Sequence, residues 1–212
     1  MSVSIAMVSA VRTNPPLITD LMRNNALGIE LEYEQMDSTE AWKTEYWVAA
    51  PDGSLRNRGI ELVSRPLAFP DVAAAIDDAE TIVLESGAIA SARCGIHTHM
   101  NMRPYSMGQV WSLAALYAII EPTLYQTYAL GREDSMFAVP MWRNTSQVNY
   151  LYRDITALRV LRSGASMPGC LALQSSKYSA LNFTSLLQFG TLEMRQPYCT
   201  TDFEAIRSWV EF

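Results

Sequence analysis

The chain contains few cysteines and few histidines. Its 212 residues include three cysteines, Cys94, Cys170 and Cys199, and two histidines, His97 and His99. The cysteines are odd in number, lie far apart and include no Cys-x-x-Cys pair. These features argue against a disulfide framework or a cysteine zinc site, and they make a reducing compartment, the cytoplasm, the expected location.

The chain also contains fewer basic than acidic residues. The sequence has 16 lysines and arginines against 22 acidic residues, a net charge of −6 and a pI of about 4.9. Binding nucleic acid through its phosphates requires a basic surface, so no nucleic-acid partner is expected. The sequence also lacks a Walker-type phosphate loop and a dinucleotide-binding fingerprint.

Long apolar runs are missing as well. The longest, residues 111–120, ends at Glu121 and Pro122, well short of the roughly 20 residues that a bilayer-spanning helix needs. Residues 1–10 carry no basic segment, so they do not match a signal peptide. We therefore expect no membrane partner.

What remains is an ordinary globular composition, with 49% hydrophobic and 18% charged residues. This length and composition predict one domain over residues 1–212 with a sizeable core. Most strands are expected to follow one another as hairpins, without regular βαβ alternation. This order predicts an α+β fold, an antiparallel sheet with helices packed on one face.

The expected elements follow from residue periodicity and from turn and cap residues. Residues 1–16 are expected to be an irregular lead-in and residues 163–169 a loop. The last expected helix reaches Phe212 without a C-cap signal, as in a chain that ends inside an element. The strands are expected at 27–35, 46–49, 55–63, 93–102, 178–183 and 189–195, with a Pro-Asp-Gly-Ser turn at residues 51–54. The helices are expected at 71–85, with Gly87 just past the end, and at 107–129, 154–162 and from about 202. Capping boxes at Ser106 and Gln109 and at Thr201 and Glu204 are expected to start the second and the last of these helices.

Residues 28–34 alternate apolar and acidic side chains. Because side chains along a strand point to opposite faces in turn, Glu30, Glu32 and Glu34 are expected to share one face. Three carboxylates in a row repel one another, and Glu is depleted in strands. Either this face is solvated or a positive partner lies on it.

Two later stretches repeat this design. Residues 58–64 place Glu61 in a strand that repeats the Gly-Ile-Glu-Leu of the first stretch, although a single glutamate there is usually solvated. Residues 94–101 place His97 and His99 on one strand face, together with Asn101. Two neighbouring imidazoles suit a metal ion or a phosphate, whereas a lone histidine would more often be structural.

The fourth stretch, residues 190–195, places Glu193 and Arg195 on one strand face; the alternative interpretation is a cross-strand ion pair. If the apolar faces of all four strands pack under the helices, the polar faces form one concave surface. Carboxylates gathered there need cations, and oxygen ligands suit Mg²⁺ or Mn²⁺. Arg195 would then meet an anion docked on the metal ions.

Together the four stretches resemble the glutamine synthetase superfamily of carboxylate–amine ligases. The chain is most similar to the amidoligase branch that is often found in phages and bacteria. The motifs that carry the resemblance are Gly-x-Glu-x-Glu, Gly-x-Glu, Gly-x-His-x-His-x-Asn and Thr-x-Glu-x-Arg, in this order between Gly28 and Glu211. The segment from Tyr178 to Asn182 is similar to that branch as well.

The resemblance implies a fold like the glutamine synthetase catalytic domain and an ATP-dependent ligase with two or more Mg²⁺ or Mn²⁺ ions. The substrates would be small-molecule or peptide carboxylates and amines. A homo-oligomer is compatible with it, and so is the host cytoplasm if a phage encodes the chain. The residue roles it implies are metal binding for Glu30, Glu32, Glu61, His97 and Glu193, contact with nucleotide phosphates for His99, contact with the transferred phosphate or substrate carboxylate for Arg195, and a second anion contact for Arg143.

In this chemistry, phosphorylation by ATP turns a carboxylate into an acyl phosphate that a neutral amine attacks. Metal ions and an arginine neutralise charge during phosphoryl transfer. Glu34 or Glu61 could accept the proton of the amine, and the sequence does not select between them.

Two other functions stay open at this level. One is a metal-dependent hydrolase that uses His97, His99 and a carboxylate. The other is a non-catalytic phage, structural or binding protein that descends from the same fold. Metal-dependent nucleotide binding separates the ligase from both.

Overall fold

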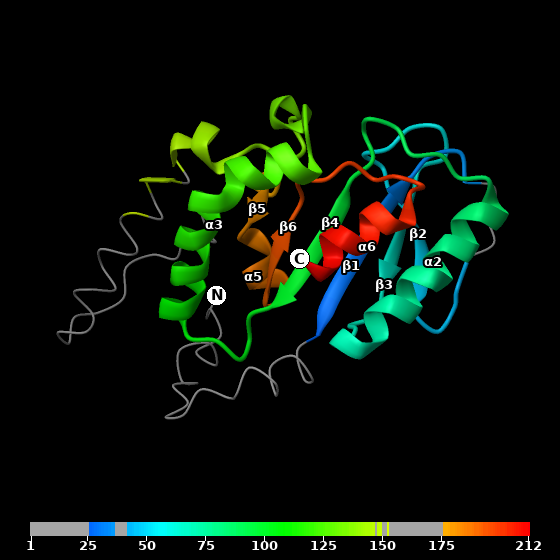
Figure 1. Ribbon diagram of the computed structural model, residues 1–212, viewed down its shortest axis with the longest axis horizontal. Coiled ribbons are helices and arrows are strands. Elements are labelled where there is room, and N and C mark those ends of the chain that lie inside the picture. The colour runs from blue at the N-terminus through cyan, green and yellow to red at the C-terminus, as the bar shows by residue number, and fades with distance from the viewer. Residues whose placement is uncertain (1–25, 37–41, 147, 150–151, 153–175) are drawn as a thin grey trace. The chain divides into compact units, whose positions relative to one another are not determined.

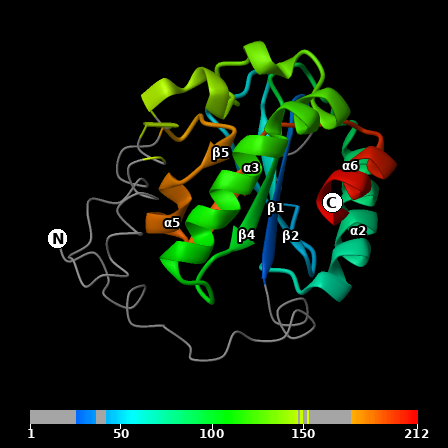
Figure 2. The same cartoon turned by 60° about the vertical axis from the view of Figure 1, so that its left-hand side comes forward.

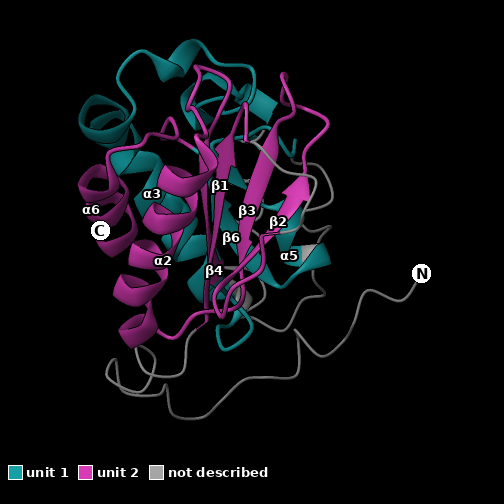
Figure 3. Ribbon diagram, turned by 90° about the vertical axis from the view of Figure 1, so that its right-hand side faces the viewer, with its two compact units in different colours: residues 1–15, 101–195 teal, residues 16–100, 196–212 magenta. Residues whose placement is uncertain are grey.

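The computed structural model describes residues 26–36, 42–146, 148–149, 152 and 176–212 (Figure 1). The expected lead-in at 1–16, helix at 154–162 and loop at 163–169 lie outside these residues. The chain divides into two compact units (Figure 3), unit 1 with residues 1–15 and 101–195, and unit 2 with residues 16–100 and 196–212. Each unit is described by itself, and the single domain expected over residues 1–212 stays a prediction.

The described residues form antiparallel strand pairs together with helices, which confirms the predicted α+β class. None of the helices in these residues has both the length and the apolar character that a membrane span needs. In chain order the elements are β1 (Leu27–Tyr33), β2 (Trp47–Pro51), β3 (Ile60–Ser64), η2 (Phe69–Asp71), α2 (Val72–Ser86), β4 (Ile96–Asn101), α3 (Met107–Tyr128), η3 (Arg132–Asp134), η4 (Met141–Arg143), β5 (Leu181–Asn182), α5 (Thr184–Gln188), β6 (Thr191–Met194) and α6 (Phe203–Glu211).

Unit 2 is built on an antiparallel sheet in which β1 is a central strand. β1 pairs with β3 on one side and with β4 on the other, and β2 pairs with β3. All three pairings are antiparallel, as predicted for this part of the chain. Ile29, Leu31 and Tyr33 of β1 are almost completely buried, so they form the apolar face that the alternation predicts.

Helices α2 and α6 cover this apolar face. The indole nitrogen of Trp47 in β2 donates to the carbonyl oxygen of Ala75 in α2 at 2.7 Å. The indole nitrogen of Trp209 in α6 donates to Thr98 Oγ1 in β4 at 2.9 Å. The two helices lie side by side (Figures 1 and 2), on one side of β1, β2 and β3 (Figure 3). The opposite face of the sheet is therefore left to the polar side chains.

The ends of the unit 2 helices follow local chemistry. Gly87, with φ of 65°, ends α2 in the left-handed conformation, at the position expected from the sequence. The N-cap of α6 is Asp202, and the prediction of a capping box at Thr201 and Glu204 was wrong. The Asp202 carboxylate accepts hydrogen bonds from two backbone amides, and its negative charge suits a helix N-terminus.

Unit 1 contains the long helix α3 and the β5–β6 pair. α3 begins with the predicted capping box of Ser106 and Gln109. β5 and β6 pair antiparallel, with Asn182 opposite Glu193. Both strands are shorter than predicted. Between them, Asn182 Oδ1 accepts from the Thr184 amide at 2.9 Å, at the start of the unpredicted helix α5.

Candidate functional site

Acidic and histidine side chains share the sheet face of unit 2 opposite α2 and α6. Cross-strand partners point to the same side, and the register places Glu32 opposite Glu61 and Glu30 opposite His97. We call this surface the acid face; it carries Glu30, Glu32, Glu61, His97 and His99.

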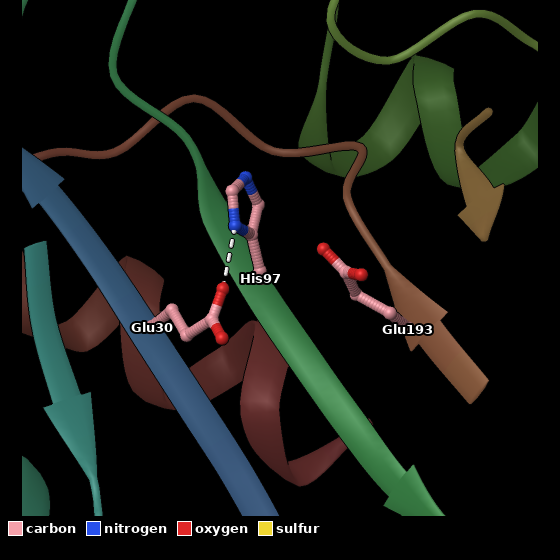
Figure 4. Close-up of side chains that lie close together, drawn as sticks. All are labelled: Glu30, His97 and Glu193. Carbon is pink, nitrogen blue, oxygen red and sulfur yellow. Dashed lines mark hydrogen bonds and ion pairs between the residues drawn. The ribbon is translucent and has the colours of Figure 1, made fainter. Parts of the chain in front are cut away.

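His97 lies at the centre of three carboxylates. Its Nδ1 atom is 3.0 Å from Glu30 Oε2 (Figure 4) and 3.9 Å from Glu61 Oε1. Its Nε2 atom is 3.6 Å from Glu32 Oε1. Only 3% of the His97 side chain and 7% of the Glu32 side chain are exposed, so the centre of this face is not solvated.

Glu30 lies between the two imidazoles. Besides its bond to His97, its Oε1 atom is 3.1 Å from His99 Nε2. Burial by itself would raise the pKa of Glu30, but the hydrogen bonds and charges of His97 and His99 outweigh it and hold the pKa well below the usual range. Gly28 makes room for the His99 ring, because a Cβ atom there would lie 3.2 Å from His99 Cβ.

The pKa of Glu61 is shifted in the opposite direction to that of Glu30. Burial, and then the charges of Glu30, Glu32 and Asp52, raise the pKa of Glu61 to about 9. Glu32 does have one donor, the backbone amide of Gly95 at 2.6 Å from its Oε2 atom. The ionised form of Glu61 is therefore disfavoured by burial and by the carboxylates beside it.

The donor set of the acid face fits a divalent cation. One ligand atom each from Glu32, Glu61 and His97 lies within 4.8 Å of the others. Two carboxylates and one imidazole are ligand types that Mn²⁺ and Mg²⁺ sites use, and a cation there would relieve the repulsion on Glu61. The structure therefore brings together Glu30, Glu32, Glu61, His97 and His99 of the predicted site residues.

Glu34, the third acidic residue of the first stretch, has a different environment. It is 3% exposed, and its two carboxylate oxygens accept hydrogen bonds from the Arg56 amide at 3.0 Å and from Asn57 Nδ2 at 3.4 Å. Both partners belong to the loop between β2 and β3. Because Glu34 anchors this loop, we do not assign it the proton of an attacking amine.

Glu193 belongs to unit 1 and is surrounded by donors. It is 4% exposed, and its Oε2 atom accepts from Asn182 Nδ2 at 2.7 Å and from Ser185 Oγ at 2.8 Å. Its Oε1 atom forms an ion pair with Arg195, which directly follows β6. The sequence placed Glu193 and Arg195 on one face, and the structure pairs them within one chain segment rather than across two strands.

Both predicted anion-binding arginines lie in unit 1, and both already contact carboxylates. Arg195 pairs with Glu193, and its Nε atom donates to the Phe137 carbonyl oxygen at 3.3 Å. Arg143 pairs with Asp134, and its side chain is 46% exposed. Arg143 is thus a surface residue of η4 held by its own neighbours.

Sequence reasoning missed three residues around these clusters. Asn182 and Ser185 hold Glu193, and Asn182 ended the quoted 178–182 segment without being given a role. Asp52 continues the acid face beyond Ala50, since Ala50 pairs with Glu61 and side chains alternate. Its only sequence signal was the Pro-Asp-Gly-Ser turn, which indicated a loop and no chemistry.

Unit 2 thus presents carboxylates and imidazoles on the sheet face opposite its helices. A family model described as "Putative amidoligase enzyme" matches residues 17–212. The chain therefore belongs to this amidoligase family, which confirms the resemblance identified from its motifs. Among curated proteins and among solved structures, nothing matches the chain.

Proposed function

We propose that the protein is an ATP-dependent carboxylate–amine ligase with a fold like the glutamine synthetase catalytic domain. Membership of the amidoligase family supports a ligase. The observation that carries the rest is the convergence of Glu32, Glu61 and His97, whose ligand atoms lie within 4.8 Å of one another. Such a cluster is suited to divalent cations that accompany ATP.

In the proposed reaction, an oxygen of the substrate carboxylate attacks the γ-phosphorus of ATP, ADP leaves and an acyl phosphate forms. The neutral amine then attacks the acyl carbon, phosphate leaves, and the nitrogen loses a proton. The substrates are small-molecule or peptide carboxylates and amines. Bound Mg²⁺ or Mn²⁺ would neutralise phosphate charge and orient the triphosphate.

The residues of the chain contribute positioning. Glu30, Glu32, Glu61 and His97 hold the cations. The hydrogen bond of Glu30 to His97 and its close contact with His99 help to orient the two rings. His99 is proposed to contact the nucleotide phosphates. In unit 1, Glu193 is proposed as a further cation ligand. Arg195 is proposed to stabilise charge on the transferred phosphoryl group.

The test is binding of a non-hydrolysable ATP analogue with and without Mg²⁺ by calorimetry. We expect Mg²⁺-dependent binding that Glu32→Gln weakens by at least about tenfold, because the substitution removes one anionic ligand. The matched control is Glu80→Gln, which removes the same charge from an exposed position of α2, on the other side of the sheet. The control is expected to bind like the wild type.

If folded wild-type protein binds no nucleotide, the proposed ATP-dependent reaction is wrong. Amide hydrolysis without ATP would then favour the hydrolase, and its absence the non-catalytic descendant. If Mg²⁺-dependent binding is found, carboxylate–amine pairs are screened for ADP release.

A further inference from the structure

The loop between β2 and β3, residues 52–59, lies at one end of the acid face. The β2–β3 ladder continues past its last named pair, because the Asp52 amide donates to the Gly59 carbonyl oxygen at 3.2 Å. Side-chain alternation then places Asp52 and Gly59 on the same side of the sheet as Glu61. The loop therefore starts and ends on the acid face.

The loop folds back over this face. A Cβ atom added to Gly59 would lie 2.0 Å from Leu55 Cβ and 3.0 Å from two further Leu55 carbons. Since Gly59 shares its side with Glu61, Leu55 lies against the backbone on the acid-face side. This close packing is why the expected strand over 55–63 is wrong at its start, and β3 begins only at Ile60.

Several bonds hold the loop in place. Glu34 accepts from the Arg56 amide and from Asn57 Nδ2, and the Gln35 amide donates to the Asn57 carbonyl oxygen at 2.9 Å. Asn57 and Arg58 are both left-handed, with φ of 50° and 58°, a conformation that non-glycine residues rarely adopt twice in succession. A buried carboxylate and a strained backbone thus fix the conformation of this loop.

The fixed loop presents the guanidinium group of Arg56. Its side chain is exposed and forms no hydrogen bond or ion pair with the residues that the structure describes. The Arg56 backbone is bound to the Glu34 carboxylate, and Glu34 is two residues, roughly 7 Å along the strand, from Glu32. Arg56 is therefore held beside the strand position that follows Glu32 on the acid face, and Glu32 lies opposite Glu61.

We propose that Arg56 binds an oxyanion, a carboxylate or a phosphate, of the ligand whose other end is held by cations on Glu32, Glu61 and His97. This inference rests on the proposed function, since it concerns a ligand of the same site. Glu34 takes up the backbone amide of Arg56, so the guanidinium group is what Arg56 can offer to an anion. It is suited to this task, because it presents several N–H donors in one plane.

The test compares three titrations followed by calorimetry. They use Mn²⁺ alone, a non-hydrolysable ATP analogue with Mn²⁺, and the dicarboxylate glutarate with Mn²⁺. The variants are Arg56→Gln, Arg56→Lys and the control Arg207→Gln, which removes a positive charge from α6 on the other side of the sheet. Thermal unfolding of each variant verifies that it is folded.

We expect Mn²⁺ to bind all variants alike. At least one oxyanion probe is expected to bind Arg56→Gln about tenfold more weakly, Arg56→Lys with intermediate affinity, and Arg207→Gln like the wild type. The probe that loses affinity shows whether Arg56 contacts a phosphate or a carboxylate.

Three results would overturn the proposal. They are unchanged affinity of Arg56→Gln for both probes, failure of the Mn²⁺-loaded wild type to bind either probe, and loss of Mn²⁺ binding itself in folded Arg56→Gln. If the wild type binds glutarate but no nucleotide, and Arg56→Gln weakens glutarate binding, ATP dependence fails while the role of Arg56 stands. If the nucleotide binds wild type and Arg56→Gln equally and glutarate does too, only the role of Arg56 fails.

Discussion

The two units of this protein bury carboxylates in opposite ways. In unit 1, Glu193 lies among the donors of Asn182, Ser185 and Arg195. In unit 2, Glu61 faces Glu32 across two strands, and burial, together with the neighbouring carboxylates, raises its pKa to about 9. A buried carboxylate surrounded by donors stabilises the fold, whereas carboxylates that face one another need a further positive partner. This difference supports the proposal that the acid face binds cations.

Glu121 is a second buried carboxylate of unit 1. It is fully buried, and its oxygens accept hydrogen bonds from Tyr117 Oη and from the Met141 amide. Burial, which these bonds only partly offset, still raises the pKa of Glu121 to about 7. Glu121 therefore has partners, yet it remains sensitive to pH.

The largest change in the free energy of unfolding is expected from Glu193→Gln. The substitution leaves the mostly buried Arg195 without its counter-ion, which destabilises a protein by about 3–5 kcal/mol. Urea unfolding followed by circular dichroism measures the change, with Glu80→Gln as the exposed control. A change within about 0.5 kcal/mol of the control would contradict the assignment of Glu193 to a donor-satisfied cluster.

A change of similar size in the free energy of unfolding is expected when a rise in pH removes the proton of Glu121. Its folded pKa of about 7 lies above its ordinary value of 4.5, so the folded state binds the proton more tightly. Its contribution to stability is therefore full below pH 4.5 and declines as the pH rises to about 7, by roughly 3 kcal/mol in total. Unfolding free energies measured across this range should lose this slope in Glu121→Gln. An identical slope in wild type and variant would show that other groups cause it.

The third-largest change in the free energy of unfolding is expected when cations bind to the acid face. Mg²⁺ or Mn²⁺ at a hundredfold excess over its Kd should stabilise the wild type by about 2.7 kcal/mol, since a ligand that binds only the folded state shifts the unfolding equilibrium. Differential scanning fluorimetry with increasing metal concentration measures this shift. Glu32→Gln should reduce it strongly and Glu80→Gln should not. Equal shifts in all three proteins would place the cation elsewhere.

The smallest change in the free energy of unfolding is expected from Glu61→Gln in the absence of metal. Because its pKa is about 9, the Glu61 carboxyl is protonated at pH 7, so Glu61→Gln should leave the stability of the metal-free protein within about 0.5 kcal/mol there. At about pH 10, where the wild-type carboxylate is ionised beside Glu32, the substitution should stabilise the protein by about 1 kcal/mol. The same variant should lose most of its stabilisation by Mg²⁺. Destabilisation of the metal-free variant by more than about 1 kcal/mol would mean that Glu61 has donors like those of Glu193.

Much of unit 2 was predictable because its signals are local. The period of two in residues 28–34 predicted which side chains of β1 share a face, and the histidines of β4 followed the same rule. Helix α2 was predicted from its composition and from Gly87. The four motifs in order identified the amidoligase family.

Other features depended on residues far apart in the chain. Nothing near Glu34 indicates that its carboxylate binds the backbone of Arg56, 22 positions away. The burial of Glu121 against Met141 likewise depends on packing between α3 and a later segment. Helix α5 was missed because a single side-chain contact of Asn182 redirects a chain that has strand-like composition.

The sequence by itself determined the family and the faces of the β1 and β4 strands, because alternation and motif order are properties of neighbouring residues. Only the tertiary structure decided which carboxylates face each other and which meet donors. Strand register sets Glu32 against Glu61, while a side-chain contact between β5 and β6 sets Asn182 against Glu193. The charge state of a buried carboxylate follows from these neighbours, and the linear order of residues does not contain them.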